Sequence, residues 1–224
     1  MIYPDVKEAR FVSRPNRFLA KIRCGEEELT VHVKNTGRCA ELFVPGARVW
    51  ISRAQNPDRK TAYDLVTVER GDGMLVNVDS QIPNVLVRTF LEKQKPQILR
   101  PEYRFGESRL DFYMKNDGKE TLIEVKGCTL ERGGTGYFPD APTQRGTRHV
   151  HELIRAVKEG YQAEIWFVIQ MNGVTRVKAN RVQDPDFADV LEKAEEAGVR
   201  IRMLPCRIKV DGIGLIPMPD LYEG

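Results

Sequence analysis

Two acidic residues and a lysine, Asp111, Glu124 and Lys126, have the types and spacing of a divalent-metal site. Carboxylate oxygens are ligands that Mg²⁺ and Mn²⁺ prefer, and the backbone carbonyl of Val125 offers a third hard oxygen. A lysine two residues after Glu124 on the same strand projects from the same face, where it can orient a water or stabilise a charged phosphate. The reaction that needs this set of groups is the hydrolysis of a phosphodiester.

A predicted hairpin brings the two acids together. Asp117 and Gly118 lie between two β-prone runs, and both can adopt the positive φ of a type I′ turn. Counting back from that turn along both strands places Asp111 opposite Glu124. Opposed like charges destabilise a ladder by roughly 0.2–1 kcal/mol, whereas a bound cation reverses the sign of the interaction. The register therefore favours a metal site.

A structural interpretation of the same residues stays open. Asp111 can form a ladder ion pair with Arg109 or Lys126, and Glu124 with Lys126. Such pairs contribute little when they lie on a surface, and the pattern E-x-K is common by chance.

The first part of the chain predicts a small β-barrel. Residues 9–78 contain short strand-forming runs separated by turn formers such as Pro45-Gly46 and Gly71-Asp72-Gly73. Because no helix is available to cover an open sheet, the strands are expected to close, and an OB-like barrel is favoured over an SH3-like one. We predict that residues 1–80 form an OB-like barrel that binds nucleic acid.

Residues 81–224 predict a second, α/β domain that carries the hairpin. A helix is expected from about residue 83 until Pro96, followed by a strand at 103–105 and the two hairpin strands. Apolar spacing over 150–157 predicts a second helix, and the nearly continuous apolar run 163–171 is typical of a buried strand reached by a right-handed parallel crossover. A helix capped by Asp184, a strand region broken at Pro205 and a loose tail complete the prediction.

Basic residues in both predicted domains suit a polyanionic partner. Residues 130–147 are expected to form a long irregular loop with a functional role, leading into a helix start where free N–H groups favour phosphate. The side chains predicted to contact nucleic acid are Arg17, Lys34, Arg38, Arg109, Arg145, Arg148 and His149. For each barrel residue the alternative is an ordinary solvated surface.

Composition excludes some classes of protein and leaves others open. The chain has 224 residues and a formal net charge of +3, which permits a nucleic-acid partner without requiring one. Four widely spaced cysteines without a C-x-x-C pair argue against zinc and disulfides. The absence of a signal-peptide pattern and of a long apolar run predicts a cytoplasmic protein. No phosphate-binding glycine loop or nucleophile elbow supports a kinase or an α/β-hydrolase.

Motifs along almost the whole chain resemble the sugar fermentation stimulation protein A family. They include S-R-L-D-F at 108–112, E-V-K-G-C-T-L at 124–130 and G-Y-F-P-D-A-P-T-x-R-G-x-x-H at 136–149, with R-F-L-A at 17–20 and N-T-G at 35–37. The resemblance implies an OB-like barrel followed by a domain similar to the PD-(D/E)xK restriction-endonuclease fold. It also implies DNA binding and a regulatory link to sugar metabolism.

The resemblance implies roles for particular residues. Asp111, Glu124 and Lys126 match active-site positions of PD-(D/E)xK nucleases, and Glu92 is the candidate counterpart of the acid that some of them carry on the first helix. The roles of Glu92 and Asp140 stay open. Analogy with nuclease-like domains that cut duplexes as dimers suggests a homodimer.

Two hypotheses follow for function. The first is a Mg²⁺- or Mn²⁺-dependent nuclease acting on DNA or RNA. The second is a non-catalytic, DNA-binding regulator of sugar metabolism that keeps the nuclease-like scaffold. Acidic residues facing a polyanion favour the first, because binding alone would select neutral or basic residues there.

Overall fold

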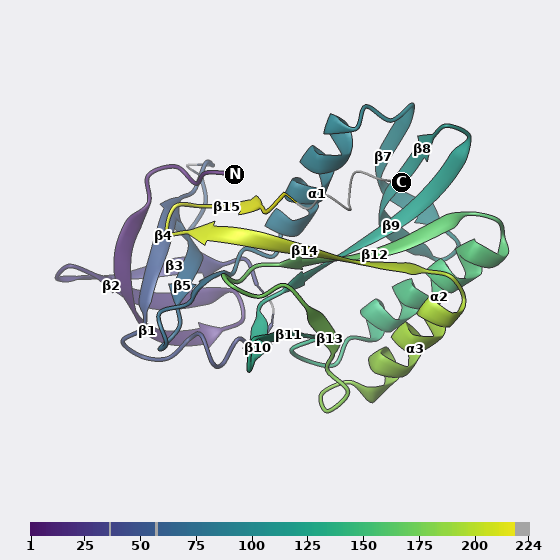
Figure 1. Ribbon diagram of the computed structural model, residues 1–224. Coiled ribbons are helices and arrows are strands. Elements are labelled where there is room, and N and C mark those ends of the chain that lie inside the picture. Colours follow the sequence, from purple (N-terminus) through teal and green to yellow (C-terminus); the bar gives the residue numbers. More distant parts are fainter. Residues whose placement is uncertain (36, 57, 218–224) are drawn as a thin grey trace. The chain divides into compact units, whose positions relative to one another are not determined.

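The chain folds into two compact units (Figure 1). The computed structural model describes residues 1–35, 37–56 and 58–217. The first unit contains Met1–Ser80, Gln170–Val174 and the chain from Leu204, and the second contains Gln81–Ile169 and Thr175–Met203. The chain therefore passes between the units more than once.

The first unit is built on a closed barrel of antiparallel strands. Their order is β3-β2-β1-β4-β5-β6, and a parallel pairing of β3 with β5 closes the ring, which confirms the predicted OB-like barrel. Side chains alternate between the core and the solvent along these strands, as Ala20 and Ile22 in β2 show by their complete burial. The strands are β1 (Lys7–Asn16), β2 (Leu19–Cys24), β3 (Glu27–Val33), β4 (Arg48–Arg53), β5 (Tyr63–Glu69) and β6 (Leu75–Asn77).

Later parts of the chain, which the sequence placed with the second domain, complete the first unit. β14 (Arg200–Lys209) continues through Pro205, so the predicted break there was wrong. Proline lacks an N–H group, but the Pro205 carbonyl accepts a hydrogen bond from the Ile216 N–H at 2.9 Å. β15 (Gly212–Leu215) pairs with β14, and Gly212 forms a β-bridge with Ile2. These residues of the predicted loose tail are therefore part of the first unit. Residues 218–224 of the predicted tail lie outside the described residues.

The second unit is an α/β domain in which helices cover both faces of a sheet (Figure 1). The sheet order is β15-β14-β12-β9-β8-β7, in which β14 belongs to this unit up to Met203 and to the first unit from Leu204. β12 runs parallel to β9 after the α2 crossover, as predicted. α1 packs on the face that carries Trp166, and α2 packs on the face that carries Glu124. The elements are α1 (Ile82–Lys93), β7 (Ile98–Phe105), β8 (Ser108–Asn116), β9 (Lys119–Cys128), α2 (Gln144–Lys158), β12 (Gln162–Ile169) and α3 (Pro185–Glu196).

The segment predicted as a long irregular loop contains regular structure. β10 (Leu130–Arg132) and β11 (Thr135–Phe138) form a short hairpin, and β11 pairs in parallel with β13 (Val177–Ala179). Gly133 and Gly134, with φ of 58° and 80°, supply the turn, because glycine adopts positive φ without steric cost. α2 then begins at Gln144, where the Thr143 hydroxyl accepts a hydrogen bond from the Gly146 N–H.

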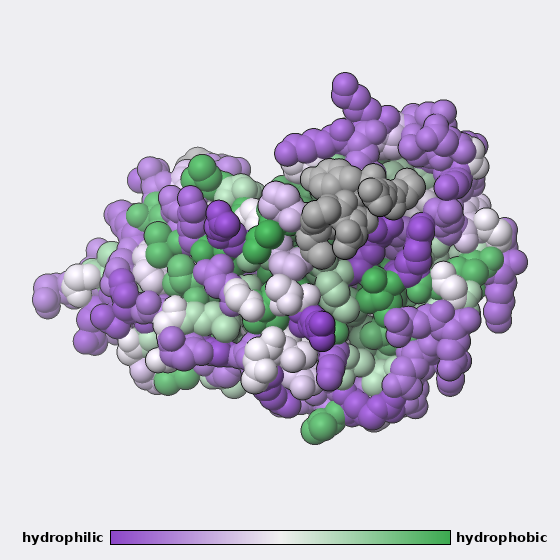
Figure 2. Space-filling view, viewed as in Figure 1, coloured by the Kyte–Doolittle hydropathy of each residue, from purple (hydrophilic) through white to green (hydrophobic). Residues whose placement is uncertain are grey.

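Two local predictions are confirmed by the structure, the cap of α3 and the free cysteines. The Asp184 carboxylate caps α3 by accepting from the Phe187 N–H at 3.0 Å, with Pro185 at the first helical position. No disulfide links the four cysteines, all of which are described. Within the described residues, no helix is long and apolar enough to cross a membrane. The surface over α2 and α3 is largely hydrophilic in Figure 2, which agrees with the exposure of Lys158 and Glu159.

Candidate metal centre

The β8–β9 hairpin has the predicted turn and register. Asp117 and Gly118 have φ of 49° and 76°, the positive values that a two-residue type I′ turn requires. The ladder then pairs Tyr113 with Leu122, and ends with Phe112 opposite Ile123. Continuing this register by one residue brings Asp111 level with Glu124.

Asp111 alters the ladder at the point where it ends. Its Oδ2 accepts a hydrogen bond from the Val125 N–H at 2.7 Å, an amide that a regular antiparallel ladder would direct at the main chain of β8. A side-chain oxygen thus takes the place of a main-chain partner. The carboxylate is fixed between the two strands rather than projecting freely from one of them.

A second contact holds Asp111 from the first helix. The Asn84 side-chain amide, in the first turn of α1, donates to Asp111 Oδ1 at 2.7 Å. Burial and the nearby negative charge of Glu124 together raise the Asp111 pKa to about 6, against the lowering effect of the two hydrogen bonds.

Glu124 is buried, with only 3% of its surface exposed. Its Oε1 lies 2.6 Å from Lys126 Nζ and 2.6 Å from His149 Nδ1. Burial raises the pKa of this carboxyl, but the charge of Lys126 and the hydrogen bond from His149 outweigh it, so the net pKa is lowered. Glu124 is therefore ionised at neutral pH.

The second oxygen of Glu124 has an unusual environment. Oε2 is buried and has no hydrogen-bond partner among the described residues. A buried carboxylate oxygen without a partner costs free energy, on the order of 1–3 kcal/mol or more for a charged group. A cation bound at this oxygen would remove that cost.

The residues present fit a hard divalent cation with few protein ligands. The donors are Asp111 and Glu124, with the Val125 carbonyl as a predicted third oxygen. In the described part of the chain, no group of three or more histidine, cysteine, aspartate or glutamate side chains is arranged to hold a metal. The oxygen donors of Asp111 and Glu124 are of the type that hard divalent cations take.

Comparison with known proteins assigns the chain to a family. Residues 12–78 match the family model described as the SfsA N-terminal OB domain, and residues 81–212 match the sugar fermentation stimulation protein RE domain. The chain belongs to the sugar fermentation stimulation protein family. Its relatives include homologues of that protein from Desulfitobacterium hafniense, 44% identical over 95% of this chain and 94% of the relative, and from Clostridium beijerinckii, 42% identical over 99% of each.

A solved structure of another family member has the same fold. It is described as the structure of Pyrococcus furiosus SfsA in complex with Ca²⁺, and it matches this chain with a TM-score of 0.85 and 30% identity. The match covers 96% of this chain and 94% of the other. The likeness therefore extends over both units of the family fold.

In the present chain, His149 lies beside the carboxylate of Glu124. It is buried in α2, where its Nδ1 contacts Glu124 and its Nε2 lies 3.5 Å from Arg145 Nε. Sequence reasoning expected it at the start of the helix in contact with a phosphate, and that contact stays a prediction. Arg145 and Arg148 are exposed on the same helix.

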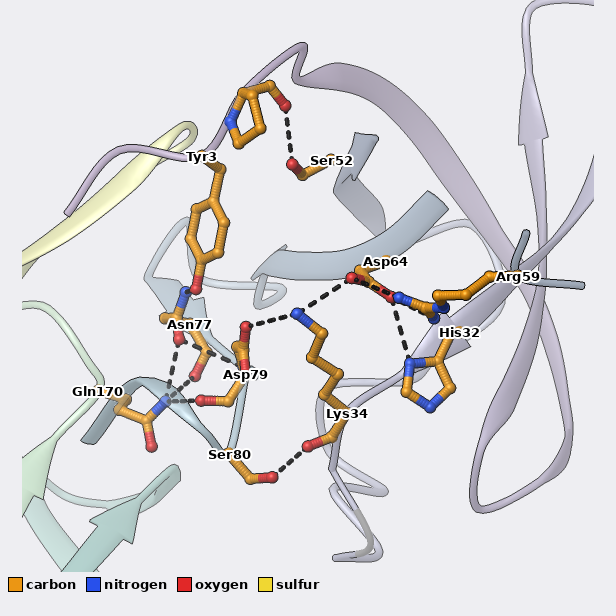
Figure 3. Close-up of polar contacts among 11 residues, drawn as sticks. Tyr3, His32, Lys34, Ser52, Arg59, Asp64, Asn77, Asp79, Ser80 and Gln170 are labelled. Carbon is orange, nitrogen blue, oxygen red and sulfur yellow. Dashed lines mark hydrogen bonds and ion pairs between the residues drawn. The ribbon is translucent and has the colours of Figure 1, made fainter. Parts of the chain in front are cut away.

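The barrel residues predicted to contact nucleic acid differ in their surroundings. Arg17 and Arg38 are exposed. Lys34 instead lies between two carboxylates, with Nζ 3.0 Å from Asp64 Oδ2 and 3.3 Å from Asp79 Oδ2 (Figure 3). Burial opposes its charge, but the two acids outweigh this effect, and the Lys34 pKa is raised. Its amine contributes to an internal network of the barrel.

The remaining predicted residues lie around the second unit. Arg109 is exposed, 3.7 Å from Glu102 Oε2. Glu92 lies on the exposed side of α1, where Arg88 Nε donates to it at 2.8 Å. Asp140 is half-buried and makes a small contribution, after burial, to the raised pKa of Cys128.

Sequence reasoning missed Asn84, the α1 residue that contacts Asp111. The amino-acid sequence did indicate that Asn84 needs a partner, because it is a polar residue within the apolar run I-P-N-V-L-V at the start of a predicted helix. A polar side chain in the first turn of a buried helix needs a partner.

Proposed function

We propose that the hairpin site binds a divalent cation, Mg²⁺ or Mn²⁺, and hydrolyses phosphodiester bonds of a nucleic acid. The observation that carries the proposal is the buried, unpartnered Oε2 of Glu124 beside the fixed carboxylate of Asp111. The description of the Pyrococcus furiosus relative as a Ca²⁺ complex supports a divalent ion in this fold. Ca²⁺ and Mg²⁺ both take oxygen ligands.

The residues of the site have separate roles in this proposal. Asp111 and Glu124 hold the cation, while Asn84 and His149 fix the two carboxylates from neighbouring helices. The bound cation supplies Lewis-acid stabilisation of the phosphate charge. Lys126, 2.6 Å from Glu124 Oε1 through its Nζ, is positioned to orient a water or to stabilise the developing negative charge.

The proposed substrate is DNA or RNA in the cytoplasm. The exposed arginines Arg17, Arg38, Arg109, Arg145 and Arg148 can contact phosphates without first breaking a buried network. Lys34 would have to leave Asp64 and Asp79 to do so. We therefore expect the arginines, rather than Lys34, to make the phosphate contacts.

A cleavage assay tests the proposal. The purified protein is incubated with single-stranded DNA, duplex DNA and RNA in Mg²⁺, in Mn²⁺ and in EDTA. We expect metal-dependent cleavage that Asp111→Ala and Lys126→Ala abolish. Glu196→Ala, which removes an exposed acid of α3, is the matched control and should cleave like the wild type. Cleavage that survives in Asp111→Ala, or no cleavage of any substrate in either metal, would refute the proposal.

A non-catalytic DNA-binding regulator is the second candidate. It is favoured by one contact, because the Lys126 amine that hydrolysis would need already donates to Glu124. This candidate predicts metal binding and DNA binding without cleavage. It also predicts that Lys126→Ala leaves DNA affinity unchanged, since the amine would serve only to neutralise Glu124.

A further inference from the structure

We propose that the first unit binds single-stranded nucleic acid by stacking a base on Phe18, at the end of the barrel where β1 leads into β2. The inference rests on the proposed nucleic-acid partner and adds the form of the strand and the side chain that receives it. Phe18 is a large apolar residue of the barrel that keeps 51% of its surface exposed. Its ring is not needed to fill the core.

A positive charge accompanies the exposed ring. The Arg17 guanidinium lies 5.7 Å from the centre of the Phe18 ring, and Arg17 is itself exposed. Arg38 is exposed on the segment that follows β3. An aromatic ring beside an arginine, with a second exposed arginine on a neighbouring segment, is the combination that non-specific single-strand binding uses, with bases on the ring and phosphates on the cations. An apolar protein partner would bury these charges without compensation.

The turn that presents Phe18 is held rigidly. Asn16 Oδ1 accepts hydrogen bonds from the N–H groups of Phe18 and Leu19 at 2.9 and 3.0 Å. The Phe18 carbonyl accepts from the Val33 N–H at 2.8 Å, which ties the turn to the end of β3. A ring on a fixed backbone loses little conformational freedom when a base stacks on it, which favours binding.

The Arg14 guanidinium stabilises the same region through hydrogen bonds to backbone carbonyls. Its guanidinium donates to the carbonyls of Arg17 at 2.8 Å, Gly37 at 2.7 Å and Arg38 at 2.8 Å, so it joins the β1–β2 turn to the segment after β3. The guanidinium also lies over the Phe43 ring at 4.7 Å. Arg14 is thereby occupied within the barrel, and the two arginines it holds by their backbones direct their side chains to the solvent.

The strands next to Phe18 extend the surface. Leu19 pairs with His32 across β2 and β3, and His32 pairs with Asp64 across β3 and β5. Asp64 accepts from Arg59 through both carboxylate oxygens and lies 3.2 Å from His32 Nδ1 (Figure 3). His32 alternates with the buried Val31 and Val33, and its side chain keeps 30% of its surface exposed. A second base can lie against this ring.

The proposed surface selects a single strand over a duplex. Bases of a duplex are stacked on each other and expose only their edges, so their faces cannot reach a protein aromatic ring. An unpaired strand has its faces available. The Phe18 surface therefore predicts a preference that phosphate contacts alone would not produce, because phosphates are present in both forms.

Phe18→Trp provides a direct optical test. The two natural tryptophans, Trp50 and Trp166, are buried, so the introduced indole gives the solvent-accessible signal. The variant is titrated in EDTA with an oligothymidylate of about 12 nucleotides, with a stable duplex and with inorganic phosphate. We expect quenching by the single strand and none by the duplex or by phosphate. Single-strand binding without any quenching, or equal quenching by the duplex, would overturn the inference.

Phe18→Ala measures the contribution of the ring. Single-strand affinity, followed by fluorescence anisotropy in EDTA, should fall on the order of tenfold, with duplex affinity unchanged. Val44→Ala, which removes another half-exposed apolar side chain of the barrel, is the matched control and should bind like the wild type. Unchanged single-strand affinity in Phe18→Ala would refute the stacking role.

EDTA separates this inference from the proposed hydrolysis. If single strands quench Phe18→Trp but the protein never cleaves them, the stacking surface is supported and the proposed nuclease activity is refuted. If the protein cleaves in a metal-dependent way but binds single strands equally well after Phe18→Ala, only the stacking surface is refuted.

Discussion

Asp111 and Glu124 are neighbouring carboxyl groups whose pKa values are shifted in opposite directions. Burial and the charge of Glu124 raise the Asp111 pKa to about 6, whereas Lys126 and His149 outweigh burial at Glu124 and lower its pKa. The difference arises because cationic and hydrogen-bonding partners gather on one acid only. Repulsion between the two carboxylates therefore raises the pKa of Asp111 and not that of Glu124.

The raised pKa of Asp111 predicts a pH-dependent stability for Asp111→Asn. The acid has a raised pKa in the folded protein, so ionising it destabilises the fold, and the cost is absent below pH about 4 and complete above pH about 6. The variant should gain about 3 kcal/mol over the wild type at pH 8 and nothing at pH 4. Asn84 can rotate its amide to accept from the new side chain, and Val125 keeps an acceptor.

Urea unfolding of both proteins across this pH range gives the measurement. Glu92→Gln, at an exposed acid, is the control and should show no comparable change with pH. An Asp111→Asn gain of the same size at pH 4 and pH 8 would contradict the account of a buried, ionised carboxylate.

His149 should position Glu124 for the cation. Its Nδ1 holds Oε1 at 2.6 Å, which leaves Oε2 as the oxygen without a partner. His149→Ala should weaken binding of Mn²⁺ or Ca²⁺ by roughly 10- to 100-fold, the usual effect of removing an outer partner of a ligand. Titration calorimetry on the folded variant measures this. His151→Ala, at an exposed position of the same helix, should bind metal normally, and equal affinities in both variants would count against the positioning role.

At the scale of elements, the hairpin turn sets where the two acids meet. Gly118 has φ of +76° with open space around its Cα, so a side chain there is strained without a clash. Gly118→Ala should destabilise the protein by about 1 kcal/mol, since alanine avoids this conformation. Gly71 also has open space but no positive φ, and Gly71→Ala should be neutral or slightly stabilising. Thermal or urea unfolding compares the two, and equal effects would argue against the strain.

The sequence predicted the elements whose structure depends on nearby residues. The Asp117-Gly118 turn fixes the hairpin register within two residues, and Asp184 caps α3 three residues ahead. The hairpin after Leu130 was missed because β11 takes its other partner from β13, about forty residues later in the chain. Strand continuity at Pro205 likewise depends on a donor from Ile216.

The candidate site was predictable in part for the same reason. Asp111 and Glu124 follow from the register of one turn. Asn84 and His149 reach them only because α1 and α2 pack against the hairpin, and helix packing does not follow from local spacing. The unpartnered Glu124 oxygen is a property of the packed site as a whole, and so appears only in the structure.

At the scale of the whole molecule, the exposed arginines predict a strong salt dependence of nucleic-acid binding. Each phosphate contact contributes about one unit to the slope of log affinity against log salt. The double variant Arg17→Ala/Arg38→Ala should reduce that slope by about 2, measured by anisotropy in EDTA from low to high salt. Arg88→Ala, at an arginine paired with Glu92 on α1, is the control. A slope unchanged by the double variant would exclude these two contacts.

The discontinuous first unit has a consequence for how this protein can be dissected and made. The Asn77 side-chain amide donates to the Tyr3 hydroxyl at 2.9 Å, and Asn77 Oδ1 in turn accepts from the Gln170 amide at 2.9 Å. β15 arrives more than one hundred residues after the barrel strands. During translation, the barrel strands leave the ribosome before Gln170 and β15 have been synthesised. A fragment of residues 1–80 would carry the complete ring of strands, yet it would lack the pieces that cover its buried polar groups.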